Sequence, residues 1–211
     1  MKLYNANFSP NALRVRAVAL ELGINLEIIE VDLRSGENRN EDFLAINPNA
    51  KIPVLKDGDF ILWESRAINS YLASKKPERG LYPDDPKARA IVDQWLYWQT
   101  IHLGPAMQKL SFERFLKSNF GMGDPDQGVI DAEIGNVDQF LAVMEIGLEG
   151  KEWIAGELSV ADFALASTFM YRKQSDISLD KLPNVANWIE RLEGRKSWQD
   201  AFAPVLAMFG G

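Results

Sequence analysis

The chain has 211 residues, of which 46% are apolar and 25% charged, the composition of a globular protein with a substantial core. It contains no apolar run of membrane-spanning length, and its first residues lack an apolar stretch of signal-peptide length, so we expect a cytoplasmic protein without a membrane partner. Its net charge of −7 argues against a nucleic-acid partner.

The residue types restrict the chemistry further. The sequence has no cysteine and a single histidine, His102. Disulfides, thiolate metal sites and a cysteine nucleophile are therefore excluded, and neither a histidine-rich metal site nor a Ser-His-Asp triad is expected. We accordingly expect no metal and no permanently bound cofactor.

Strand and helix patterns alternate in the first part of the chain. Strands are predicted over residues 2–6, 26–33, 53–56 and 60–63, and helices over 11–23, 40–46 and from Glu64 to about 75. The helix over 11–23 has an apolar stripe that includes Leu13, Ala17, Val18 and Leu20. The order β-α-β-α-β-β-α indicates an α/β domain with a mixed sheet and helices on its faces, over residues 1–76.

Helical patterns alone occupy the rest of the chain. A linker is predicted over 77–86, within a stretch of three prolines and one glycine. Helices are predicted beyond it, over 87–117, 126–149, 160–173, 183–193 and 195–202. The helix over 126–149 is strongly amphipathic, with one apolar face made of Ile130, Ile134, Val137, Leu141, Met144 and Leu148. Residues 87–211 should therefore form an all-helical bundle domain. The acidic excess also lies in the second part of the chain, which favours two domains.

Three loops of the first domain carry side chains suited to ligand binding. The first contains Ser9 and Asn11, the second Asn38 and Arg39, and the third runs from Lys51 to Ser65. In a sheet of this order, the loops at the carboxyl ends of the parallel strands form a crevice where ligands usually bind. Arg39 and Lys51 are suited to hold a carboxylate there, although a lone surface cation is more often only solvated.

Several of these residues have a structural interpretation beside the functional one. Ser9 before Pro10, and Ser65 after Glu64, can each cap a helix or hold an anion at its positive end. Asn11 is a second donor or a surface residue of the first turn. The position of Pro53 at a strand entrance favours an ordinary edge proline and a cis proline equally; a cis bond would leave the backbone of Ile52 free to pair with an extended peptide.

A further motif lies in the helical domain. Ser159 and Asp162 have the spacing of a capping box, and Leu158 and Phe163 have the spacing of its hydrophobic staple. We interpret this motif as structural, fixing the start of a core helix.

Three stretches carry a resemblance to a known family over essentially the whole chain. They are SPNALRVRAVALELG, GENRNEDFLAINPNAKIPVLKDGDFILWESRAINSYL and GELSVADFALAST. With them the chain resembles a cytosolic glutathione transferase of the serine-type branch, similar to phi-like and related bacterial members. The segment KIPVL followed by ESRAI is the most specific of these features. The resemblance implies a thioredoxin-like first domain followed by the helical domain.

The resemblance also implies an activity and a set of roles. The activity is detoxifying conjugation of glutathione, as co-substrate, to hydrophobic electrophiles. Ser9, or Asn11 as the alternative donor, would stabilise the glutathione thiolate, and Ile52 beside cis Pro53 would pair with the cysteinyl part. The remaining implied contacts are Glu64 and Ser65 to the γ-glutamyl end, Arg39 and Lys51 to the glycyl carboxylate, and Asn38 where phi-like members often carry histidine.

The electrophile is expected to lie between the two domains. The candidate apolar walls are Phe8, Ala12 and Leu13 on one side, and Phe112, Phe115, Phe120 and the segment 202–211 on the other. The resemblance further implies a homodimer, with Arg66 and the helix over 87–117 near the interface. Two alternatives remain: a glutathione-dependent peroxidase or reductase, and a non-catalytic module that binds glutathione or a protein. The complete set of Ser9, Ile52-Pro53 and Glu64-Ser65 favours catalysis.

Overall fold

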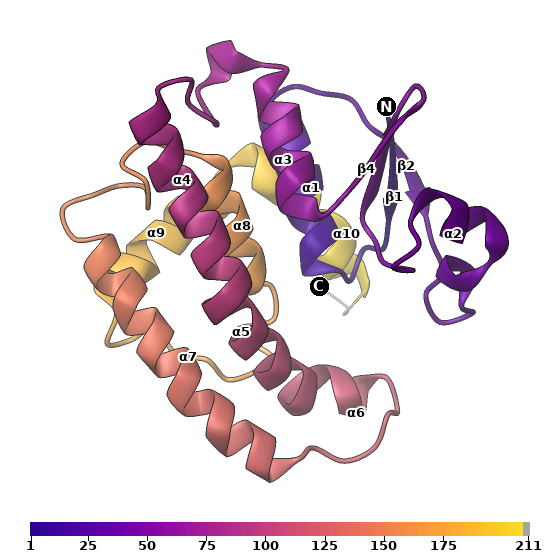
Figure 1. Cartoon of the computed structure of the whole chain (residues 1–211). Coiled ribbons are helices and arrows are strands. Elements are labelled where there is room, and N and C mark those ends of the chain that lie inside the picture. The colour runs from indigo at the N-terminus through magenta and orange to yellow at the C-terminus, as the bar shows by residue number, and fades with distance from the viewer. Residues whose placement is uncertain (209–211) are drawn as a thin grey trace. The chain divides into compact units, whose positions relative to one another are not determined.

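The computed structural model describes residues 1–208 (Figure 1). The chain divides into two compact units, the first made of Met1–Pro83 together with the chain from Glu193 onward, and the second made of Asp84–Leu192. The C-terminal helix thus belongs to the first unit, whereas the sequence pattern assigned it to the helical domain. An apolar helix face shows that the helix is packed, but it does not show against what.

A four-stranded mixed sheet forms the centre of the first unit. Its strands are β1 (Lys2–Asn5), β2 (Glu27–Glu30), β3 (Val54–Asp57) and β4 (Phe60–Trp63). They lie in the order β2-β1-β3-β4, with β1 parallel to β2 and β3 antiparallel to both β1 and β4. This confirms the predicted mixed sheet and the thioredoxin-like order of elements.

The strand register brings the predicted ligand loops to one edge of the sheet. Asn5 is paired with Glu30, Tyr4 with Val54, and Val54 with Trp63. The chain after β1, after β2 and after β4, and the chain before β3, therefore all leave the sheet at the same edge. These four segments carry the predicted ligand residues from Ser9 to Ser65.

Helices pack on both faces of the sheet. The helices of the first unit are α1 (Pro10–Glu21), η1 (Glu37–Arg39), α2 (Glu41–Ile46), α3 (Ser65–Ser74), η2 (Pro77–Arg79) and α10 (Lys196–Met208). Figure 1 shows α1, α3 and α10 on one side of the sheet and α2 on the other, and α1 contacts both α3 and α10. Ala12 through Ala19 are all buried, so α1 is the central helix of the unit. Leu20 is 43% exposed, so its predicted place on the apolar stripe is wrong.

Polar contacts fasten α10 to α1. Arg195 donates to both carboxylate oxygens of Glu21, at 3.1 and 2.5 Å, and Ser197 donates to the same carboxylate. The Arg16 guanidinium donates to the backbone carbonyl of Ala201 at 3.1 Å. The helix continues through Pro204 to Met208, beyond the predicted end at 202. Residues 209–211 of the candidate segment 202–211 lie outside the described residues.

The second unit is helical. Its elements are α4 (Pro86–Trp98), η3 (Gln99–Leu103), α5 (Gly104–Ser111), η4 (Phe112–Leu116), α6 (Lys117–Asn119), α7 (Gln127–Gly147), α8 (Val160–Thr168) and α9 (Pro183–Glu193). The first five follow one another without a break, as one helix that contains two π-helical turns. The long helix α7 lies beside this run (Figure 1) and buries most of its predicted apolar face. The predicted helix over 160–173 ends at Thr168, because residues 169–176 form turns.

A capping box starts α8. Asp162 accepts from the Ser159 N–H at 2.9 Å, and the Ser159 hydroxyl oxygen accepts from the Ala161 N–H. The carboxylate also accepts from the Ile154 N–H and from the Trp188 indole N–H, each at 2.9 Å. Asp162 therefore joins three segments of the second unit. No helix among residues 1–208 has the length and apolar character needed to cross a bilayer.

Candidate functional site

Ser9 caps α1. Its backbone is extended, Pro10 is the first helical residue, and its Oγ accepts a hydrogen bond from the Ala12 N–H at 3.3 Å. A serine hydroxyl that accepts one hydrogen bond still has its own proton to donate. The oxygen also lies at the positive end of the helix dipole. Capping therefore leaves Ser9 able to donate to an anion, and the two interpretations of its sequence position are compatible. Asn11, the alternative donor, is exposed on the first turn.

Ile52 and Pro53 precede β3 at the same sheet edge. The peptide bond between them is cis. Pro53 is buried and Ile52 half-buried. Within residues 1–208 the backbone N–H and C=O of Ile52 take part in no backbone hydrogen bond, although the sheet pairing begins two residues later at Val54. Ile52 is thus free to pair with an extended ligand.

Two asparagines hold the loop that leads to Ile52. The Asn38 amide donates to the Ala50 carbonyl at 2.6 Å, and the Asn47 amide donates to the Lys51 carbonyl at 2.6 Å. Between these contacts Ala50 adopts a left-handed φ of 55°. In the structure the Asn38 amide group therefore forms a hydrogen bond with the protein backbone. Asn47 is buried and was missed by the sequence reasoning, for which the turn pattern Asn-Pro-Asn was the available signal.

The same contact makes the chain segments that carry Arg39 and Lys51 neighbours. Asn38 is next to Arg39 in the chain, and its partner Ala50 is next to Lys51. Both cations are exposed, and neither forms a hydrogen bond or ion pair with a described residue. Two unpaired cations on adjoining loops are a suitable site for a carboxylate.

Glu64 and Ser65 start α3 at the end of β4. Glu64 has a left-handed φ of 71°, an unfavourable conformation for a residue with a side chain, and its carboxylate forms no cap with the helix. Ser65 is the first residue of α3 and is buried. The N–H groups of the first turn are therefore left without a side-chain cap, as in helix termini that bind anions.

A buried arginine on the neighbouring helix α1 contacts Ser65. Arg14 of α1 donates to the Ser65 hydroxyl oxygen at 3.3 Å. Burial lowers the pKa of Arg14 well below its ordinary value, the nearby Arg66 lowers it further, and Glu64 raises it. Burial likewise lowers the pKa of Arg66 to about 10. The sequence alone indicates no partner for Arg14, since its contact with Ser65 spans 51 positions.

The candidate apolar residues differ in exposure. Ala12 and Leu13 are fully buried, so neither presents surface to a second substrate, because both pack in the interior as part of the central helix α1. Phe8, Phe112, Phe115 and Phe120 are half-buried. Phe112 and Phe115 belong to the π-helical turn η4, a type of turn often found at functional sites.

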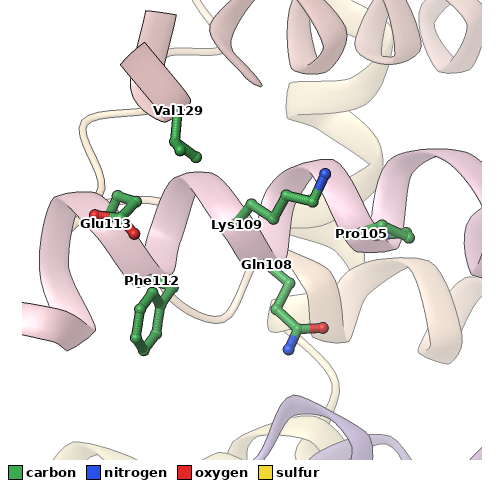
Figure 2. Close-up of a pocket in the computed structure, with 6 residues that line it drawn as sticks. All are labelled: Pro105, Gln108, Lys109, Phe112, Glu113 and Val129. Atoms are coloured by element: carbon green, nitrogen blue, oxygen red, sulfur yellow. The ribbon is translucent and has the colours of Figure 1, made fainter. Parts of the chain in front are cut away.

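A cavity of about 370 Å³ lies in the second unit. Figure 2 shows its lining side chains along one helix, with one residue opposite them at the start of α7; they are Pro105, Gln108, Lys109, Phe112, Glu113 and Val129. Lys109 forms an ion pair with Glu133 at 2.8 Å, and Glu113 one with Lys117 at 2.8 Å. Nearby in the chain, the Phe115 ring lies 5.6 Å from that of Tyr171, another residue that the sequence reasoning missed. Among residues 1–208 no cluster of three His, Asp or Glu side chains could hold a metal ion.

Known proteins match the chain along most of its length. Residues 1–74 match the glutathione S-transferase N-terminal domain, and residues 102–196 match the glutathione S-transferase C-terminal domain. Glutathione S-transferase 3 of Zea mays is 35% identical over 97% of this chain and 94% of its own length, and glutathione S-transferase D7 of Drosophila melanogaster is 35% identical over 90% and 83%. The solved structure of glutathione S-transferase I from maize in complex with an atrazine–glutathione conjugate superposes with a TM-score of 0.87, at 30% identity and with 96% of each chain covered. The chain belongs to the glutathione S-transferase family.

Proposed function

We propose that this glutathione S-transferase binds glutathione along the loop edge of its sheet and uses Ser9 to stabilise the thiolate that attacks an apolar electrophile. The observation that carries the proposal is the hydrogen bond from the Ala12 N–H to the Ser9 hydroxyl oxygen. Because this bond occupies an acceptor site of the oxygen, the hydroxyl proton remains available to a sulfur anion. The maize relative bound to a glutathione conjugate supports glutathione as the co-substrate.

A single hydroxyl group can supply the free energy needed to lower the pKa of the glutathione thiol. A free thiol has a pKa of about 8.5, so only a small fraction is ionised at neutral pH. A hydrogen bond to the charged form and a helix N-terminus both lower that pKa, and each unit requires about 1.4 kcal/mol. Hydrogen bonds to charged groups contribute about 1.5–3 kcal/mol. Ser9 can therefore increase the thiolate fraction without acting as a base.

The remaining polar residues fit an extended tripeptide. The backbone of Ile52 would pair with the cysteinyl part, as its lack of backbone partners among the described residues allows. Ser65 and the open N-terminus of α3 would receive the carboxylate of the γ-glutamyl end, and Glu64 its amine. Arg39 and Lys51 would hold the glycyl carboxylate, and Asn38 would position the loop between them.

The apolar electrophile would contact aromatic side chains that are not fully buried. In the second unit we propose Phe112, which lines the cavity of Figure 2, and Phe115, which packs against Tyr171. In the first unit we propose Phe8, which directly precedes Ser9.

A homodimer in the cytoplasm is the proposed state of the protein, consistent with its family. Large apolar side chains on the helical run from α4 and on α7 support it, because Tyr97, Ile101 and Ile146 are 68%, 65% and 72% exposed. Sedimentation equilibrium would give twice the chain mass of 23.8 kDa if this proposal is right, and the single chain mass if it is wrong.

Ser9→Ala tests the proposed function. Titration of bound glutathione by thiolate absorbance should show its pKa rising towards that of the free thiol, and kcat/KM for an activated aryl halide at neutral pH should fall at least tenfold. The dissociation constant for glutathione should change little. An unchanged pH profile with full turnover would contradict the role of Ser9, and Asn11→Ala then tests the alternative donor. Failure of the unchanged protein to turn over any electrophile while it binds glutathione would favour a binding module.

A further inference from the structure

Arg14 is a charged group held in the interior between two helices. It lies on α1, five residues beyond Ser9, and is 2% exposed. Its Nη1 donates to the Ser65 hydroxyl oxygen at 3.3 Å, and its own backbone carbonyl accepts from the Asn69 amide at 3.4 Å. Residue 14 thus contacts α3 through both its side chain and its backbone. Burying a cation costs free energy, and well-packed apolar residues join two helices at least as well, so packing alone does not account for a guanidinium here.

The contact fixes the direction in which the Ser65 hydroxyl can donate. A guanidinium has only donors, so Arg14 must occupy a lone pair of the Ser65 oxygen. The Ser65 proton therefore cannot be directed at Arg14 and is available to a ligand acceptor. Ser9 is held in the same way by the Ala12 N–H. Each of the two serines has an acceptor site occupied by the protein and keeps a donor for the ligand.

The charges around Ser65 favour an anionic ligand group. The Arg14 guanidinium interacts electrostatically with Arg66 and Glu64, so two guanidinium groups lie close together behind Ser65. The uncapped N-terminus of α3 adds the positive end of its dipole. A carboxylate at Ser65 would be attracted by these guanidinium groups and by the helix terminus, whereas an amine would be repelled by them.

We propose that Arg14 is a positioning residue that holds the Ser65 hydroxyl as a donor to the α-carboxylate of the γ-glutamyl group and places its own charge behind that carboxylate. This inference rests on the proposed glutathione site and extends it to a buried residue. It also makes α1 a common support for both ends of the site, since the helix carries the thiolate donor Ser9 at its start and Arg14 in its second turn.

The test compares two ligands in one variant. Arg14→Met keeps an unbranched, flexible apolar side chain but removes the charge and the donors. Isothermal titration calorimetry would measure glutathione and the analogue in which γ-aminobutyryl replaces γ-glutamyl, which lacks only the α-carboxylate. Glutathione should bind about 10- to 100-fold more weakly to the variant than to the unchanged protein. The analogue should change less than about twofold, and an equal loss for both ligands would overturn the proposal.

Arg16→Met is the matched control. Arg16 is also buried on α1, but its guanidinium donates to Asn5 and Ala201 rather than to Ser65. Its replacement should lower the stability of the fold and should change the affinities for the two ligands by the same factor. Selective loss of glutathione affinity in Arg16→Met would overturn the assignment to Arg14.

If Arg14→Met does not fold, a second pair of variants tests the same proposal. Arg14→Lys keeps the charge and Arg14→Gln does not, so the preference for glutathione over the analogue should be larger in the lysine variant. Equal preferences would overturn the proposal. If the unchanged protein bound neither ligand, the proposed function itself would be wrong. If it bound glutathione and responded to Ser9→Ala, but Arg14 variants did not distinguish the ligands, only this inference would fail.

Discussion

Asp162→Asn should destabilise the second unit more than its small change in shape suggests. The Asp162 carboxylate is fully buried and accepts four hydrogen bonds. One oxygen accepts from the Ile154 N–H and the Trp188 indole N–H, and the other from the N–H and hydroxyl of Ser159. Each of the four groups donates to the carboxylate, and of these only the Ser159 hydroxyl could accept from an amide NH₂ that replaced an oxygen.

The magnitude follows from which oxygen is replaced. With the NH₂ group towards Ser159, the hydroxyl can rotate to accept, and one backbone N–H is left without a partner. With the NH₂ group towards Trp188, two donors are left without a partner. A buried unsatisfied donor costs about 1–3 kcal/mol, and the remaining bonds lose the negative charge that strengthened them. We therefore expect a loss of about 2–4 kcal/mol for Asp162→Asn.

Urea unfolding at fixed protein concentration would measure this loss. Tryptophan fluorescence should report it, since Trp188 is one of the partners, and far-ultraviolet circular dichroism checks that the two signals coincide. Ser159→Ala is the smaller perturbation, because it removes the hydroxyl group but keeps the Ser159 N–H bond to the carboxylate; it should cost about 0.5–2 kcal/mol. A loss below about 0.5 kcal/mol for Asp162→Asn would refute the reasoning that the four donors depend on this carboxylate.

Two further predictions concern the packing of a glycine in the second unit and a hydrogen-bonded carboxylate in the first. In the second unit, a Cβ at Gly147 would lie 2.7 Å from two ring carbons of Trp95, so Gly147→Ala should cost about 1–3 kcal/mol in a thermal or urea unfolding experiment. Gly135→Ala on the same helix meets no atom within 4 Å and should instead stabilise the protein by up to about 1 kcal/mol, so equal effects would contradict the packing argument. In the first unit, burial raises the pKa of Glu21, but hydrogen bonds from Arg195 and Ser197 outweigh it and hold that pKa below its ordinary value of 4.5. Because the pKa is lowered, the ionised Glu21 carboxylate contributes to the stability of the folded state above pH 4.5, and this contribution is lost as pH falls through the folded-state pKa. The stability of Glu21→Gln should accordingly fall less on acidification than that of the unchanged protein, and parallel stability–pH curves would show that the carboxylate does not contribute.

Residues close together in the chain made much of the fold predictable. Ser9-Pro10 and Ser159-x-x-Asp162 are helix starts whose cap and helix lie within three positions, and both form as capped starts. The apolar spacing along 126–149 predicted the buried face of α7 in the same local way. Local pattern was less reliable at ends: the strand predicted over 26–33 is only Glu27–Glu30, because the Asp32 carboxylate accepts from the N–H groups of a turn that begins there.

The sequence by itself thus determined the succession of strands and helices along the chain and the two serines placed at helix starts, because caps and periodicity are short-range effects. Only the tertiary structure decided which groups from distant positions meet. It joined Arg14 to Ser65 across 51 positions, tied the Asn38 loop to Ala50, and returned α10 to the first unit through Arg195 and Glu21. An apolar stripe indicates that one helix face is covered, and a buried cation requires a hydrogen-bond acceptor. In both cases the packing of the whole chain decides which residues are the partners.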